Sequence, residues 1–243
     1  MLVGIDCAAQ TPKIGVALGY LDAGSISVES VAVGRPDPSS DIVSFIEADL
    51  PVVIAIDAPL GWPHPLSESL IKHNAGDSIE TIPNELFRRE TDRVVRETIG
   101  KQSLDIGADK IARVAWSALS IIGQIRAQAK REISVVTHAA DANDCRCIEV
   151  YPAATLEARG FSSKGYKGNK PEHKQCRIDL EARLRDKINY DDAVRLQMIG
   201  SDDAIDSVIC LLAAKDYIFG KTILPTNHEL ALKEGWIWVR QPD

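Results

Sequence analysis

The sequence predicts an α/β fold, in which helices cover a mixed β-sheet. Two segments, residues 2–6 and 52–57, are apolar up to a final aspartate, and strands this apolar are typical of the buried middle of a sheet. Apolar residues at helical spacing also occur, most extensively over residues 108–130. A chain of 243 residues, 45% of them hydrophobic, can bury one substantial core. We therefore expect a single domain over residues 1–243.

The first part of the chain predicts three strands, a helix and a fourth strand. These elements are expected, in chain order, over residues 2–6, 13–21, 25–33, 39–49 and 52–57. The turn residues Asp22-Ala23-Gly24 suit a hairpin between the second and third strands. Ser39 or Ser40 is expected to cap the helix, and Pro51 to end it.

The remainder of the chain predicts a helical insertion, a fifth strand and further helices. The insertion spans about residues 63–130, between the fourth and fifth strands. The segments expected within and after it are helices over 85–97 and 108–130, a short strand at 135–137, a polar loop at 141–144, a strand over 145–151, a basic loop over 162–171, helices over 172–186 and 201–219, and a strand over 236–239. Ser201 is expected to cap the last of these helices. The strand that begins at Cys145 joins the first four in a mixed five-stranded sheet flanked by helices.

Composition excludes several classes of protein. No apolar run approaches the roughly 20 residues that span a bilayer, and no signal peptide is evident at the N-terminus. We therefore expect a cytoplasmic protein with no membrane contact. Five cysteines without a Cys-x-x-Cys pair argue against a disulfide framework and a structural zinc site. Cys145 and Cys147 are expected to be small buried side chains on one face of a strand.

The charge is unevenly distributed along the chain. The net charge of −7 argues against non-specific binding of nucleic acid. Residues 159–187, however, contain nine Lys and Arg against four Asp and Glu. A second basic stretch contains Arg88, Arg89, Arg93 and Arg96. We expect an anion to be drawn to these two regions.

Carboxylates occur where a sheet can bring them together. Asp6 and Asp57 end apolar strands, and open α/β sheets bind ligands at the carboxyl ends of their strands. Asp203 and Asp206 lie three residues apart, on one face of the last predicted helix. Glu149 is a further candidate in the fifth strand. Several converging carboxylates suit a hard divalent cation, and the expected cofactor is Mg²⁺ or Mn²⁺.

Each of these acids also has a structural alternative. Asp6 and Asp57 can each cap the turn that follows its strand. Asp202 and Asp203 can stabilise the first turn of a helix by ~0.3–1 kcal/mol. Glu149 can be a solvent-facing strand residue. Asp206 fits such an alternative less well, because it lies a turn further into an apolar helix.

Arginines in the first basic stretch have the spacing of one helical face. Arg89, Arg93 and Arg96 are separated by four and three residues, and their guanidinium groups could bind phosphate. The alternative is a solvated face with internal ion pairs, such as that between Arg89 and Asp92 or that between Arg93 and Glu97.

The basic loop over residues 164–170 combines lysines, glycines and one aromatic residue. A flexible loop of this kind suits a role in holding a nucleic-acid strand, with Tyr166 stacked on a base and Lys167 at a phosphate. An ordinary surface loop is the alternative.

The order of elements matches the ribonuclease-H-like fold, in which carboxylates come from the first strand, the fourth strand and the last helix. An ordered set of motifs strengthens this likeness: Gly4-Ile5-Asp6, Ile56-Asp57-Ala58-Pro59-Leu60-Gly61, Thr91-Asp92-Arg93-x-x-Arg96, Glu149-Val150-Tyr151-Pro152, Tyr166-Lys167 and Asp203-x-x-Asp206. The set resembles the family called domain of unknown function 429, whose members are predicted nucleases of ribonuclease-H-like fold. The resemblance extends from residue 4 to about residue 214. Cys7 is a small departure, since a smaller residue would fit better beside a metal.

The resemblance implies a metal-dependent nuclease or phosphodiesterase, a hydrolase that uses ions ~3.5–4 Å apart. Its expected substrate is a nucleic acid or a nucleotide. The expected catalytic carboxylates are Asp6, Asp57, Glu149, Asp203 and Asp206. Of these, the expected metal ligands are Asp6, Asp57, Asp203 and Asp206. The expected substrate-binding residues are Arg89, Arg93, Arg96, Tyr166 and Lys167.

Two other classes of function remain open at this stage. The first is a non-catalytic binding or scaffold module on the same fold, which uses the acids structurally. The second is a phosphotransferase of the actin and sugar-kinase superfamily, which is less favoured because such kinases need a second lobe with another glycine-rich phosphate segment. The acidic remainder of the surface also leaves open a protein partner that supplies the affinity for nucleic acid, and a homo-oligomer is possible as well.

Overall fold

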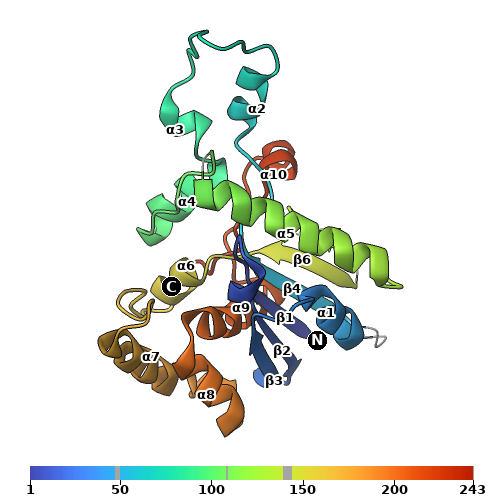
Figure 1. Cartoon of the computed structure of the whole chain (residues 1–243), viewed down its shortest axis with the longest axis vertical. Helices are drawn as coiled ribbons and strands as arrows, with labels where there is room; N and C mark the ends of the chain where they lie inside the picture. Colours follow the sequence, from blue (N-terminus) through green and yellow to red (C-terminus); the bar gives the residue numbers. More distant parts are fainter. Residues whose placement is uncertain (47–49, 108, 139–143, 243) are drawn as a thin grey trace.

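A computed structural model describes residues 1–46, 50–107, 109–138 and 144–242. These residues form one mixed sheet with helices on both faces (Figure 1). The strands are β1 (Leu2–Asp6), β2 (Gly15–Asp22), β3 (Ser25–Val33), β4 (Val52–Asp57), β5 (Ser134–Val135), β6 (Cys145–Glu149) and β7 (Ile188–Asn189). Their order across the sheet is β5-β6-β4-β1-β2-β3-β7. The predicted α/β class is therefore confirmed.

The predicted number of five strands is wrong, because the described residues form a seven-stranded sheet. The two additional strands, β5 and β7, contain two residues each and lie at the edges, parallel to β6 and β3 respectively. β5 overlaps the short strand expected at 135–137, whereas β7 was not expected. A strand as short as β7 shows no alternation of apolar and polar residues that a sequence pattern could reveal.

The middle of the sheet combines both strand directions. β1 is antiparallel to β2 and parallel to β4, and β6 is parallel to β4. In the β1–β4 pair, Leu2 lies opposite Val53, and Asp6 lies opposite Asp57. The two strands therefore end side by side.

The helices are α1 (Pro38–Ile46), α2 (His64–Leu70), α3 (Pro83–Leu86), α4 (Glu90–Ile99), α5 (Asp109–Gln128), α6 (Pro152–Glu157), α7 (Pro171–Leu184), α8 (Asp192–Gly200), α9 (Asp202–Ile218) and α10 (His228–Glu234), with a 3₁₀ turn at Thr11–Lys13. Helices α1 and α5 cover one face of the sheet, and α8 and α9 cover the other.

Apolar side chains alternate between the two faces of the central strands. Val3 and Ile5 pack on the α1/α5 side, whereas Leu2 and Val53 pack on the α9 side. Successive side chains in a strand point to opposite faces, so this alternation requires each central strand to be apolar throughout. The five cysteines, all among the described residues, form no disulfide bond. Cys145 and Cys147 are buried on one face of their strand, as predicted, and this face is on the α1/α5 side.

Between β4 and β6, where the helical insertion was expected, the described chain contains α2, α3, α4 and α5. In Figure 1, α2 and α3 lie beyond one end of the sheet, and α5 runs along its face. The predicted single helix over residues 85–97 is wrong, because α3 ends at Leu86 and α4 begins at Glu90. The break arises at Arg89, which has extended backbone angles and caps α4 together with Asp92.

Helices α6, α8 and α10 were not predicted, and one predicted strand does not form. Helix α6 begins at Pro152, since proline suits the first position of a helix, and α8 and α10 were missed altogether. The expected strand at 236–239 is wrong, because the described chain there forms only isolated bridges, one of them between Glu149 and Ile237. Parts of the expected helix at 39–49 and loop at 141–144, and the expected helix start at 108, lie outside the described residues.

None of the described helices has the length and apolar composition that a membrane span requires.

Candidate functional site

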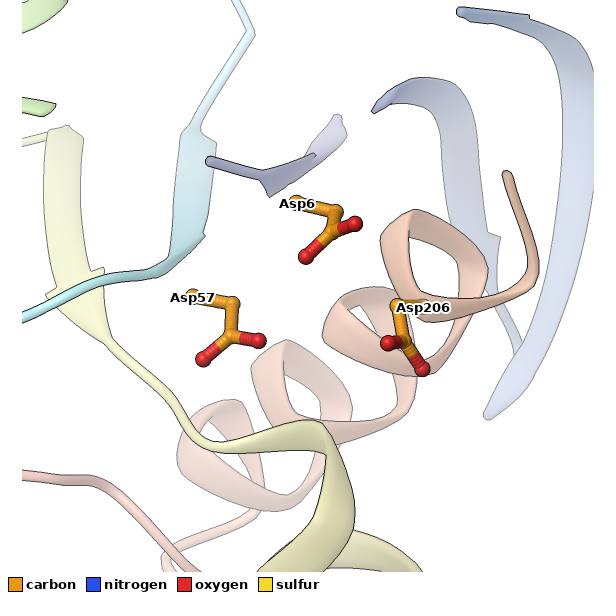
Figure 2. Close-up of side chains that lie close together, drawn as sticks. All are labelled: Asp6, Asp57 and Asp206. Atoms are coloured by element: carbon orange, nitrogen blue, oxygen red, sulfur yellow. The ribbon is translucent and has the colours of Figure 1, made fainter. Parts of the chain in front are cut away.

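Asp6 and Asp57 lie side by side because of the strand register. Each is the last residue of its strand, and they are partners in the parallel β1–β4 pair. Val3 and Ile5 face α1 and α5, so strand alternation directs Asp6 toward the α9 side of the sheet. The same alternation directs Asp57 to that side. Figure 2 shows the two carboxylates turned toward α9.

Helix α9 approaches the sheet closely because two glycines face it. A Cβ atom on Gly4 would collide with the carbonyl oxygen of Ser207, and one on Gly15 would collide with that of Asp203. The helix begins as predicted at Ser201, whose Oγ accepts hydrogen bonds from the amides of Asp203 (3.2 Å) and Ala204 (3.4 Å). Close packing and a defined start together bring the second turn of α9 to the ends of β1 and β4.

Asp6, Asp57 and Asp206 form the acidic cluster. One carboxylate oxygen from each lies within 4.8 Å of the others (Figure 2). Asp206 is 1% exposed, whereas Asp6 and Asp57 keep partial contact with solvent. Three convergent carboxylates supply the hard oxygen donors that Mg²⁺ and Mn²⁺ prefer. The chemistry of the donor set therefore fits such an ion.

Burial and mutual repulsion make the acidic cluster costly when no cation is bound. Burial, followed by the charges of Asp206 and Asp57, raises the pKa of Asp6 well above its usual range. Burial likewise raises the pKa of Asp57 to about 7, although Lys167 lowers it. The pKa of Asp206 is raised by burial too, against the opposing effect of Lys167. A divalent cation would relieve this repulsion.

Lys167 supplies a positive charge at the acidic cluster. Its Nζ lies 2.6 Å from Oδ2 of Asp206. Burial alone would lower the pKa of Lys167, but Asp206 and Asp57 leave it raised. The Lys167 side chain is still 53% exposed, and it borders the cavity described below. The ammonium group can therefore reach both the carboxylates and a ligand in the cavity.

Tyr166 does not have the role predicted from the sequence. Its ring is 1% exposed, so it cannot stack on a base, and its hydroxyl donates to Oδ1 of Asp206 over 2.7 Å. The main chain around it is held in place as well: Arg177 donates to the carbonyls of Tyr166 and Gly168, and the Gly168 amide donates to Asp202. The basic loop is thus anchored to α9 and α7, and it positions Asp206.

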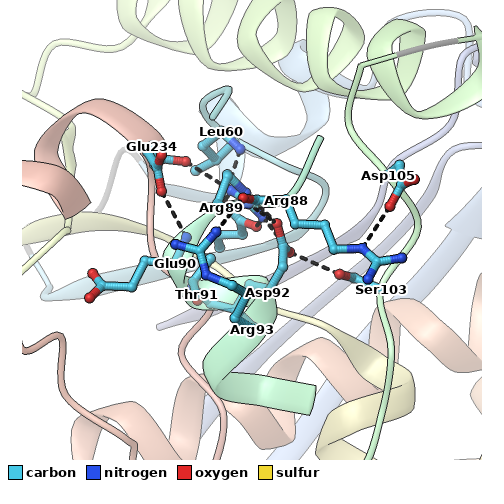
Figure 3. Close-up of polar contacts among 12 residues, drawn as sticks. Leu60, Arg88, Arg89, Glu90, Thr91, Asp92, Arg93, Ser103, Asp105 and Glu234 are labelled. Atoms are coloured by element: carbon cyan, nitrogen blue, oxygen red, sulfur yellow. Dashed lines mark hydrogen bonds and ion pairs between the residues drawn. The ribbon is translucent and has the colours of Figure 1, made fainter. Parts of the chain in front are cut away.

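Arg89 is also placed differently from its prediction as a phosphate-binding residue. It is 1% exposed, and Nε, Nη1 and Nη2 donate to Asp92, Glu149 and the carbonyl of Glu234. These five bonds use every guanidinium N–H. Figure 3 shows Arg89, Asp92 and Glu234 close together. Burial alone would lower the pKa of Arg89, but Glu149 and Asp92 leave it raised. The alternative ion pair of Arg89 with Asp92 is the one that forms.

Glu149 belongs to this buried network and lies outside the acidic cluster. It is 3% exposed, so the solvent-facing alternative is wrong. Its Oε1 accepts from Arg89 (2.6 Å), and its Oε2 accepts from Arg89 (2.8 Å) and from the amide of Leu60 (3.0 Å). These bonds link β6 to the turn that follows Asp57. Glu149 thereby acts on the position of Asp57, and its predicted catalytic role finds no support in these contacts.

The remaining predicted residues lie around the site without joining the cluster. Among the described residues, the group of acids that could hold an ion does not include Asp203, although its charge contributes to the raised pKa of Asp6. Arg93 donates to the carbonyl of Arg88, and Arg96 is exposed. Neither arginine borders the cavity next to the cluster. Cys7 is buried, and its thiol donates to the carbonyl of Val114 in α5.

A cavity of about 400 Å³ adjoins the acidic cluster. Asp6, Asp57 and Lys167 border it, together with Lys101 and Ser163, which sequence reasoning missed. Neither residue stands in a motif or a periodic segment, and they approach each other only because the insertion folds over the strand ends. No local signal could have identified them.

Comparison with known proteins places the chain in a family. The family model described as "Protein of unknown function (DUF429)" matches residues 4–230. Neither the curated proteins nor the solved structures gave a significant match.

Proposed function

The chain belongs to the DUF429 family, whose description names no activity, and from its acidic site we propose a metal-dependent nuclease or phosphodiesterase. The observation that carries this proposal is the convergence of Asp6, Asp57 and Asp206 within 4.8 Å beside a cavity. Buried carboxylates that repel one another are unfavourable unless a cation neutralises them. The cofactor we propose is Mg²⁺ or Mn²⁺.

The arrangement of elements supports a ribonuclease-H-like fold. β1, β2 and β3 form consecutive antiparallel pairs, and β4 returns parallel to β1. The three clustered acids come from the first strand, the fourth strand and the long helix α9. Fold likeness alone does not establish chemistry, so the proposal rests on the side chains at the strand ends.

The proposed mechanism divides the work between the acids and the lysine. Asp6, Asp57 and Asp206 would hold the ion, with Asp203 as a candidate for a further ligand. A bound divalent cation can activate water and stabilise charge on a leaving oxygen. If Asp206 were a ligand of the ion, the ammonium of Lys167, which now pairs with it, would be available to bind a phosphate. Tyr166 keeps the carboxylate of Asp206 oriented through its hydrogen bond.

A scaffold without catalysis is the second candidate function. The observation that favours it is the ion pair between Lys167 and Asp206, which gives the cluster a positive charge of its own. In that case the acids would stabilise the loop and the helix without any bound metal. The two candidates differ in one property, which is saturable binding of a divalent cation.

Calorimetric titration of Mn²⁺ into the metal-free protein at pH 8 tests the proposal. We expect saturable binding, and affinity at least tenfold lower in the Asp6→Asn variant, which removes one of three charges. The matched control is Asp192→Asn, which makes the same substitution in an exposed first turn of α8. Thermal unfolding of each variant confirms that it is folded.

Two outcomes would overturn the proposal. If Mn²⁺ does not bind, or if it binds equally to the unchanged protein and to Asp6→Asn, the acids are structural and the scaffold is favoured. If Asp192→Asn weakens binding as much as Asp6→Asn does, the effect arises from net charge and not from the cluster. A metal titration precedes a nuclease assay because it does not depend on choosing the right substrate.

A further inference from the structure

The cavity beside the acidic cluster is lined by both charged and apolar side chains. Asp6, Asp57 and the two lysines Lys101 and Lys167 border it. Leu104, Ile106, Ile111 and Val114, all from the insertion, line it as well. A ligand that fits must combine an anionic group with a flat or apolar body, as a nucleotide combines a phosphate with a base.

Hydrogen bonds across the walls join the insertion to the rest of the chain. Lys101 Nζ donates to Ser163 Oγ over 2.7 Å, which ties the insertion to the basic loop. The hydroxyl of Tyr151 donates to the carbonyl of Gln102 over 3.2 Å, which ties it to the start of α6. On the β1 side, the thiol of Cys7 donates to the carbonyl of Val114. These contacts hold the insertion residues that line the cavity against the rest of the chain.

The size of the cavity favours a small ligand over a polymer. Its volume of about 400 Å³ lies at the lower end of the range typical of small-molecule sites, roughly 300–1,000 Å³. A double helix does not fit a space of this size, and a single strand that continued on both sides would need two openings. One nucleotide with one free end needs only one opening.

We propose that this cavity binds a single terminal nucleotide, either free or at the end of a strand, and does not bind the middle of a polynucleotide. This inference rests on the proposed function, because Asp6 and Asp57 would repel a phosphate unless a divalent cation were bound. Lys101 and Lys167 contribute the remaining positive charge. Arg89 also borders the cavity, but its N–H groups are all engaged.

The test compares strands with and without ends. The probes are fluorescent ten-nucleotide single strands of DNA and of RNA with phosphorothioate linkages, each in a linear and a circular form of the same sequence. Fluorescence anisotropy in Mn²⁺ should show the linear form bound at least tenfold more tightly than the circular form, with a nucleoside monophosphate as competitor. Binding should disappear when Mn²⁺ is chelated.

A substitution that fills the cavity provides a second readout. Ile111 is half-buried and borders the cavity, so Ile111→Trp should reduce nucleotide binding at least tenfold. Mn²⁺ binding should not change, because the acids are untouched, and this also confirms the fold. The matched control is Leu119→Trp, which introduces the same side chain at a 37% exposed position of the same helix and away from the cavity.

Each outcome has a defined meaning. Binding of both the linear strand and the monophosphate supports a strand end as the ligand, whereas binding of the monophosphate alone supports a free nucleotide. Equal binding of circular and linear forms overturns the inference, as does retention of full nucleotide affinity by Ile111→Trp. If Mn²⁺ binds but no probe does, this inference fails while the proposed metal site stands. If Mn²⁺ does not bind either, the proposed function fails and this inference falls with it.

Discussion

Asp57 carries a carboxylate whose pKa is raised to about 7, chiefly by burial. In an unfolded chain, the pKa of an aspartate is ≈ 3.9. Between about pH 4 and pH 7, the metal-free folded protein therefore keeps a proton that the unfolded chain has lost. A group of this kind stabilises the fold below pH 4, and its contribution is lost as the pH rises through about 7.

We expect this residue to make the metal-free protein less stable as the pH rises. Urea unfolding in a chelator should show that the free energy of unfolding of the unchanged protein falls from pH 5 to pH 7.5. In Asp57→Asn this fall should be smaller by about 1–2 kcal/mol. The difference is modest because Asp57 keeps some contact with solvent. Asp6 and Asp206 share the titration, so part of the decline should remain. The Asp192→Asn control should follow the unchanged protein. Parallel curves for Asp57→Asn and the unchanged protein would contradict the raised pKa.

At the scale of elements, the site depends on how closely α9 packs on β1 and β2. Gly4 and Gly15 face the backbone of α9, and a side chain on either would collide with a carbonyl oxygen of that helix. A backbone oxygen cannot move aside as the end of a flexible side chain can. Any larger residue must therefore push α9, and Asp206 with it, away from the strand ends.

Gly4→Ala should lower the free energy of unfolding by about 1–3 kcal/mol, because overpacking strains the contact between β1 and α9. The affinity for Mn²⁺ should also fall, since Asp206 moves relative to Asp6. Urea unfolding and calorimetry measure the two effects.

The matched control makes the same change where there is room. Gly123 is exposed in α5, and a Cβ there would have no neighbour within 4 Å. Gly123→Ala should therefore raise the free energy of unfolding by about 0.5–1 kcal/mol through its higher helix propensity. If both alanine substitutions had the same sign, close packing of α9 would not be the cause.

At the scale of the whole molecule, one buried network joins distant parts of the chain. Arg89 precedes α4 and contacts Glu149 in β6 and the carbonyl of Glu234 at the end of α10. The carboxylate of Glu234 in turn accepts from the amides of His64 and Glu90. The insertion, the sheet and the C-terminal segment are thereby held together beside the acidic cluster.

Arg89→Met should lower the free energy of unfolding by about 3–5 kcal/mol, because Asp92 and Glu149 would remain buried without a cation. Arg89→Lys should restore little of this loss, since one ammonium cannot replace five N–H groups in a fixed plane. Urea unfolding measures the loss. The control Arg96→Met, at an exposed position of α4, should cost less than about 0.5 kcal/mol. Equal stability of the two methionine variants would show that the network contributes little.

Local patterns in the sequence were sufficient for the class of fold and for the candidate acids. Apolar strands that end on Asp6 and Asp57 and the cap at Ser201 all act within a few residues, so they can be identified without a structure. Elements without such patterns were missed, as the two-residue strand β7 shows. The same local information left both alternatives open for the arginines and for Glu149.

The sequence by itself determined that an α/β sheet would carry carboxylates at its strand ends. Only the tertiary structure decided which of them meet: Asp206 joins Asp6 and Asp57, whereas Asp203 does not. It also decided that Arg89 pairs with Glu149, 60 residues away. The physical reason is that strand register, close backbone packing and the burial of charges arise between segments far apart in the chain, and no pattern within one segment specifies its partner.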